Sequence, residues 1–249
     1  MTNLMLLLAF IYPMGSAGSG YPGQAPVRTM SSAHVTVYDP VDVDTSIASG
    51  YLWEFERLYS HYSSLLELGQ GERIRVRLCH DKYDFARLTG SGFINSPLWK
   101  DATLYVIAVD DIDAPGYITK LATGTILGVL DGIRRNGAPS WLVYSAAVYE
   151  SGEYEGLTPP TFENVRYFSD LEEKMQAAVS ATDLSDLLFY LGNTGKFIDT
   201  KFGAGSFSRL LHEFNSPTSF SGAVKAAFHI GVPELEREWR GYISNLVTN

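Results

Sequence analysis

Few residues in this sequence have the types and spacings that carry chemistry. The five histidines are spread along the chain without the short, regular intervals of metal ligands: His34, His61, His80, His212 and His229. The single cysteine, Cys79, cannot form an internal disulfide, and its alternating apolar neighbours favour a small buried side chain over a reactive thiol. These residues predict no catalytic residue, no metal site and no cofactor.

Three other patterns are similar to known sites but lack an essential part. Asp110-Asp-Ile-Asp113 lacks the spacing and final glutamate of a calcium loop, so we interpret its carboxylates as favouring the start of the next helix. Gly192-Asn-Thr-Gly-Lys-Phe197 is similar to a phosphate loop, but its glycines are too close together and a phenylalanine replaces the magnesium-binding hydroxyl. It is better interpreted as a helix or turn. Glu172 and Glu173 are ordinary solvated charge on a helix.

The composition is that of a globular protein. The 249 residues are 45% hydrophobic and 13% aromatic, which is enough for a large core in one large domain or two small ones. Lys and Arg total 19 against 28 acidic residues, giving a net charge of -9 and a pI near 5.0. Since this charge repels a phosphate backbone, we expect no nucleic-acid partner.

The first 33 residues predict a leader and a linker. The apolar run Leu4–Met14 is followed by small residues, which favours a signal peptide over 1–17 with cleavage near Ala17, although basic residues before it are absent. An uncleaved anchor or a disordered tail are the alternatives. Residues 18–33 are predicted to be a linker. We therefore expect an exported protein, periplasmic or extracellular, with no transmembrane span in the mature chain.

Hydrophobic periodicity places the secondary structure of the remaining chain. It predicts strands at 34–38, 73–79 and 103–109, and helices at 50–68, 81–88, 117–134 and 233–246. In the third helix Gly124, Gly128 and Gly132 recur every four residues. Each glycine costs about 1 kcal/mol relative to alanine inside a helix, so we expect a neighbour to pack closely against this stripe.

The second strand carries a row of three arginines on one face. Arg73, Arg75 and Arg77 alternate with apolar residues, so that face must be solvated or paired. One interpretation is a docking strip for an acidic partner. The other is a solvated sheet face balanced by neighbouring carboxylates.

Two segments resemble the active-site helices of the bacterial peptidase MA-like family of gluzincin metallopeptidases. They are Lys120-Leu-Ala-Thr-Gly-Thr-Ile-Leu-Gly-Val-Leu-Asp131 and Ala138-Pro-Ser-Trp-Leu-Val-Tyr-Ser-Ala-Ala-Val-Tyr-Glu-Ser-Gly152. That family pairs a His-Glu-x-x-His helix with a second helix that supplies a glutamate ligand, in a context similar to Pro-x-Trp-Leu-x-Glu-Gly-x-Ala-x-Tyr. Three further segments resemble other parts of the family in the same order: 84–90, 190–203 and 231–243.

The resemblance implies an α+β fold of the two-lobed, thermolysin-like zincin type. Residues 34–249 would form a single gluzincin-like domain. Its parts would be a small mixed β-sheet lobe with helices (34–116), two pseudo-active-site helices (117–152) and a mainly helical lobe (153–249).

Every position that would carry the family's chemistry is altered. The two histidines fall on Thr123 and Leu127, the catalytic glutamate on Gly124 and the third ligand on Tyr144. These side chains offer no zinc ligand set, and glycine cannot act as a base. We therefore expect a catalytically inactive, peptidase-like protein that acts as a protein-binding or scaffold subunit. The alternative is a cryptic hydrolase with a non-zinc or rearranged active site.

A peptide groove between the lobes can survive the loss of the metal, because pairing with an extended strand needs no catalytic residue. In this hypothesis Thr123, Tyr144 and Tyr149 line the groove with hydroxyls and aromatic surface. Equally, Tyr144 fills the space that the metal would take. The expected partner is a protein or peptide, and the sequence does not give the oligomeric state.

Overall fold

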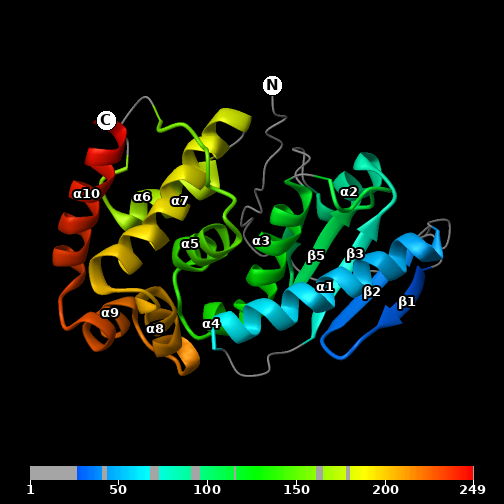
Figure 1. Cartoon of the computed structure of the whole chain (residues 1–249), viewed down its shortest axis with the longest axis horizontal. Coiled ribbons are helices and arrows are strands. Elements are labelled where there is room, and N and C mark those ends of the chain that lie inside the picture. The colour runs from blue at the N-terminus through cyan, green and yellow to red at the C-terminus, as the bar shows by residue number, and fades with distance from the viewer. Residues whose placement is uncertain are drawn as a thin grey trace.

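The computed structural model describes residues 27–40, 44–67, 73–90, 96–114, 116–160, 165–177 and 180–248. The predicted signal peptide lies outside these residues. The described part combines a mixed sheet with many helices, which confirms the α+β class (Figure 1). Within these ranges, no helix has both the length and the apolar character needed to cross a membrane.

The sheet has five strands, in the order β1-β2-β3-β5-β4. Strands β2, β3 and β5 are parallel, and the two edge strands, β1 and β4, pair antiparallel to their neighbours. The bounds are β1 Val27–Ser31, β2 Val35–Pro40, β3 Ile74–Cys79, β4 Leu98–Lys100 and β5 Thr103–Ile107. Three of these strands confirm the sequence prediction to within two residues at each end.

Strand β1 corrects the sequence analysis, which gave residues 18–33 to a linker. Val27 to Ser31 pairs with β2 from Val27 opposite Pro40 to Ser31 opposite Thr36. A tight turn joins the two strands, and Ser32 N donates to Val35 O at 2.9 Å. An edge strand forms hydrogen bonds to a neighbouring strand along one edge only and buries little side-chain surface. Its sequence therefore shows only a weak alternation of apolar residues.

Helices α1 and α3 cover one face of the sheet, whose apolar side chains are at most 1% exposed: Val35, Val37, Ile74, Val76, Leu78, Leu104 and Val106. The two helices also contact each other, and the Tyr51 and Tyr117 hydroxyls are 2.8 Å apart. The helices of this half are α1 Thr45–Leu65, α2 Lys82–Thr89, α3 Tyr117–Val129 and α4 Asp131–Arg135. The Asp81 side chain caps α2 and a left-handed Gly90 ends it, in agreement with the helix predicted over 81–88.

The predicted helix over 117–134 is two helices. Helix α3 ends at Val129, and the short α4 begins at Asp131 after Leu130. Two of the three glycines pack as expected: a Cβ on Gly124 would lie 2.8 Å from Leu104 Cδ1, and one on Gly128 would lie 2.8 Å from Ile74 Cδ1. A Cβ on Gly132, which lies in α4, would meet nothing within 4 Å, so the expectation of close packing is wrong at this position.

The remaining helices form the other half of the molecule (Figure 1). They are α5 Ser140–Ser151, α6 Phe168–Ala177, α7 Ala181–Phe202, α8 Ser206–His212, a 3-10 helix Glu213–Asn215, α9 Phe220–Phe228 and α10 Val232–Thr248. Gly192 to Phe197 lies within α7, which confirms the helical interpretation of that segment. Helix α5 contacts α3 on one side and α7 on the other, so it joins the two halves.

Candidate functional site

The residues that the resemblance aligns with a peptidase site lie along the contact between α3 and α5. Thr123 marks one end of this contact. Its side chain is fully buried, and its Oγ1 is 2.8 Å from Ser151 Oγ and 2.6 Å from Glu153 Oε2. The Thr123 hydroxyl, with its single hydrogen, can donate to either the Ser151 hydroxyl or the Glu153 carboxylate, while Ser151 Oγ donates to the Val148 carbonyl at 3.3 Å. Thr123 is thus part of a buried polar cluster at the end of α5.

Glu153 is the charged member of this cluster. Burial raises the pKa of its carboxyl to about 7, and the Thr123 hydrogen bond and the positive charge of Lys120 oppose the increase only in part. Glu153 Oε1 is buried and has no hydrogen-bond partner among the described residues. Burial also lowers the pKa of Lys120, while the Glu153 carboxylate opposes that change. The carboxyl therefore changes its charge near neutral pH.

Gly124 and Leu127 belong to the core. A Cβ on Gly124 would lie 2.8 and 3.1 Å from the two methyl carbons of Leu104 and 3.5 Å from Pro97 Cβ, so this position faces the sheet. Leu127 is 2% exposed. Gly124 has no room for a side chain without repacking, and a metal ligand at the Leu127 position would have to replace a buried apolar side chain.

Tyr144 lies toward the other end of the helix pair. It is seven residues before Ser151 on α5, which is about 10 Å along the helix axis. Burial raises its pKa, with opposing effects from the charges of Arg134 and Glu172. Since Glu172 accepts the Trp141 backbone N–H at the start of α5, this tyrosine lies away from Thr123.

Tyr149 contacts α7 instead. Its hydroxyl donates to Asp199 Oδ2 at 3.3 Å, and a Cβ on Gly195 would lie 2.6 Å from its ring. The other oxygen of Asp199 accepts the Phe207 N–H at 2.8 Å. Burial and the negative charge of Asp199 raise the pKa of Glu150, the next residue on α5, to about 7.

The structure therefore divides the five predicted site residues. Thr123, Gly124, Leu127 and Tyr144 are buried, at 9% exposure or less, and only Tyr149 is half-buried. Because Thr123 and Tyr144 are buried, neither offers open surface in this structure, and the groove lining stays a prediction.

The sequence analysis missed the carboxylates that matter most here. Glu150 and Glu153 come at the end of α5, directly after the residues that resemble the family motif, so their position was the available signal. Asp199 is 50 residues away from Tyr149, and no local pattern connects the two. Among the described residues, no group of three or more His, Cys, Asp or Glu side chains is arranged to hold a metal ion.

Comparison with protein-family models, with curated proteins and with solved structures found no match for this chain.

Proposed function

We propose that this chain is a catalytically inactive protein with a zincin-like, two-lobed architecture that binds a protein or peptide partner after export. One observation carries the proposal. The positions that the gluzincin resemblance gives to a zinc ligand and to the general base, Leu127 and Gly124, are packed into the core against apolar neighbours. A position that stabilises the core in this way cannot also hold a metal or activate water.

A binding role follows from what remains. The helix pair and the mixed sheet form a rigid scaffold, and an exposed edge strand such as β1 can pair with an extended peptide without any catalytic residue. The half-buried Tyr149 is the one predicted groove residue that keeps some exposed surface. The partner surface is therefore to be sought outside the α3–α5 contact.

Two measurements test this proposal. The purified chain is incubated with a peptide library, alone, with zinc and with a chelator, and we expect no cleavage in any sample. The tagged chain is also crosslinked in its native cells, and we expect a stoichiometric protein partner in the exported fraction. Zinc-dependent cleavage would overturn the loss of catalysis, and recovery of the chain without a partner would overturn the binding role.

A hydrolase that uses other residues is the second candidate, and the carboxyls of Glu150 and Glu153 favour it. Each has a pKa of about 7, the range in which a carboxyl can act as a general acid or base. Chelator-insensitive cleavage that is lost in Glu150→Gln and kept in the exposed Glu155→Gln would establish this alternative. No cleavage by the wild-type chain would exclude it for the peptides in the library.

A further inference from the structure

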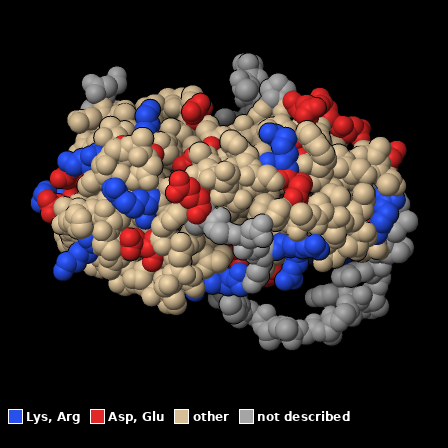
Figure 2. Space-filling model, turned by 60° about the horizontal axis from the view of Figure 1, so that its bottom comes forward, with Lys and Arg blue, Asp and Glu red and all other residues tan. Residues whose placement is uncertain are grey.

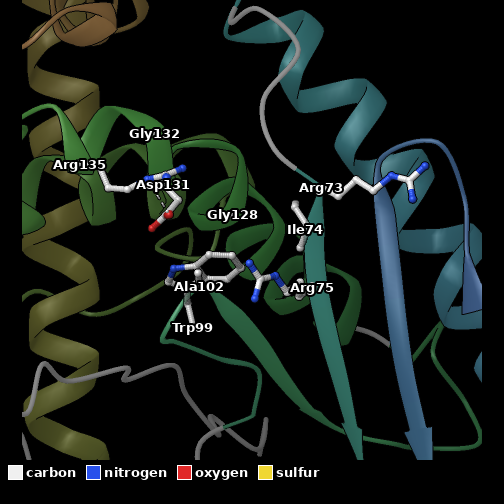
Figure 3. Close-up of a pocket in the computed structure, with 9 residues that line it drawn as sticks. All are labelled: Arg73, Ile74, Arg75, Trp99, Ala102, Gly128, Asp131, Gly132 and Arg135. Carbon is white, nitrogen blue, oxygen red and sulfur yellow. Dashed lines mark ion pairs between the residues drawn. The ribbon is translucent and has the colours of Figure 1, made fainter. Parts of the chain in front are cut away.

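A small pocket opens between the end of the sheet and helices α3 and α4 (Figure 3). Its cavity volume is about 50 Å³, which is enough for a small functional group and too little for a whole ligand. The lining residues come from β3, from β4 and the turn after it, and from α3 and α4: Arg73, Ile74, Arg75, Trp99, Ala102, Gly128, Asp131, Gly132 and Arg135.

The pocket lies where the two faces of the sheet meet. By strand register, Trp99 shares a face with Leu104, under the helices, whereas Arg75 shares the opposite face with Thr103. Ile74 and Thr103 begin their strands, so this end of the sheet is open to side chains from both faces. In Figure 3 the Arg75 side chain extends toward the Trp99 ring.

The lining has an excess of positive charge. The lining residues include three arginines and one carboxylate, Asp131, which pairs with Arg134 at 2.8 Å and with Arg135 at 3.3 Å. Arg73 points away from the pocket in Figure 3, and its Nε donates to the Ala33 carbonyl at 3.1 Å. Arg75 differs from these arginines, because it has no ion pair or hydrogen bond within the part of the chain that the structure describes.

Trp99 forms the wall beside Arg75. A Cβ on Gly128 would lie 3.1 Å from the indole ring, so the close approach of α3 fixes the ring in place. Its Nε1 is buried without a partner among the described residues. Since this atom has almost no exposed surface, Trp99 contributes its ring to the pocket wall, and Arg75 supplies the charged group.

We propose that this pocket binds a carboxylate group of the partner, with Arg75 as the cation that pairs with it. The guanidinium offers two parallel N–H donors that match a carboxylate. The single negative charge suits the site better than a phosphate dianion, because Asp131 stands in the wall and the whole protein carries a charge of -9. In Figure 2, basic side chains gather in the lower middle of the face in view and acidic ones along its upper right, so the two signs of charge are unevenly spread over the surface. This inference rests on the proposed function in one respect: that the carboxylate belongs to a protein or peptide partner.

The test uses the full chain and the indole N–H signals of its four tryptophans in nuclear magnetic resonance spectra, with the Trp99 signal assigned by Trp99→Phe. Three probes are titrated: acetyl-triglutamate amide, acetyl-triglycine with a free carboxyl terminus, and sodium phosphate. Acetyl-triglycine amide is the uncharged control. We expect the Trp99 signal to shift with a millimolar dissociation constant for at least one carboxylate probe and not for the amide.

The charge variants identify the cation. We expect Arg75→Gln to weaken carboxylate binding about tenfold or more. Arg75→Lys should weaken it less, because lysine keeps the positive charge but lacks the two parallel N–H donors. Arg237→Gln, an exposed change on α10, is the control for net charge and should leave binding unchanged. A folded Arg75→Gln, checked by its thermal transition, that binds like the wild type would overturn the proposal.

The probes separate the possible sources of the group. Binding of the triglutamate alone assigns the pocket to acidic side chains, and binding of the free terminus assigns it to a peptide end. Tighter binding of phosphate than of both carboxylates, or no shift with any probe, would refute the carboxylate site. These outcomes are independent of the crosslinking experiment, so failure of the pocket and failure of the binding role can be distinguished.

Discussion

At the scale of single residues, the carboxyl of Glu153 makes the stability of the protein depend on pH. Its pKa rises from 4.5 to about 7 on folding, chiefly because it is buried. The folded chain therefore binds more protons than the unfolded chain between these values, and this group's contribution to stability falls as the pH increases through that window. We expect Glu153→Gln to be more stable than the wild type at pH 8, by up to about 3 kcal/mol, and nearly equal to it at pH 4.

The measurement for Glu153 is the free energy of unfolding by urea at both pH values. Glu155→Gln, an exposed change two residues later, controls for the loss of one charge and should change stability by less than about 0.5 kcal/mol at either pH. An equal effect of Glu153→Gln at pH 4 and pH 8 would show that the carboxyl does not titrate in this range. Because Glu150 titrates in the same range, only the difference from the wild type isolates Glu153.

Also at this scale, the sequence indicates which residues are of interest better than it indicates which residues they contact. Thr123 was singled out for a missing histidine, but its hydrogen bonds to Ser151 and Glu153 depend on how α3 and α5 lie against each other. Asp199 and Tyr149 meet across 50 residues. Such contacts are set by tertiary packing, which local periodicity does not encode.

At the scale of elements, the close packing of α3 on the sheet gives a matched pair of substitutions. Alanine at Gly128 would place a Cβ 2.8 and 2.9 Å from Ile74 side-chain carbons, whereas alanine at Gly132 meets nothing. We expect Gly128→Ala to destabilise the protein by about 1–3 kcal/mol through overpacking, despite its better helix propensity. Gly132→Ala should stabilise it by up to about 1 kcal/mol.

Urea unfolding measures both variants. If Gly128→Ala were as stable as Gly132→Ala, the interpretation of Gly128 as a point of contact with the sheet would be wrong. The pocket gives an independent check, since displacement of the Trp99 ring by the new methyl group should also shift the indole signal of that residue.

Elements with strong local signals were predictable and those without them were not. Helix α2 begins after Asp81, whose side chain caps it, and ends at Gly90, which has a left-handed backbone conformation. Both residue types are helix-end signals that are visible in the sequence. Strand β1 has a sheet neighbour on one side only, so it was assigned to a linker. The break at Leu130 is not visible in the sequence, because Asp131 to Arg135 continues the helical pattern.

At the scale of the whole molecule, α5 couples the two halves. Eight consecutive residues from Trp141 to Val148 are buried, because α3 covers one side of the helix and α7 the other. Separation of the halves would expose this apolar surface, at about 25 cal/mol per Å². We therefore expect the sheet half and the helical half to unfold in one cooperative transition.

The tryptophans report on this cooperativity from both halves. Trp99 lies in the sheet half, whereas Trp141 and Trp239 lie in the helical half. In a urea titration followed by their indole N–H signals, the three native signals should disappear with one common midpoint. Gly195→Ala, whose Cβ would lie 2.6 Å from Tyr149 at the α5–α7 contact, should lower all three midpoints equally. Loss of the Trp239 signal at a lower urea concentration than the Trp99 signal would mean that the halves are separate folding units joined by α5.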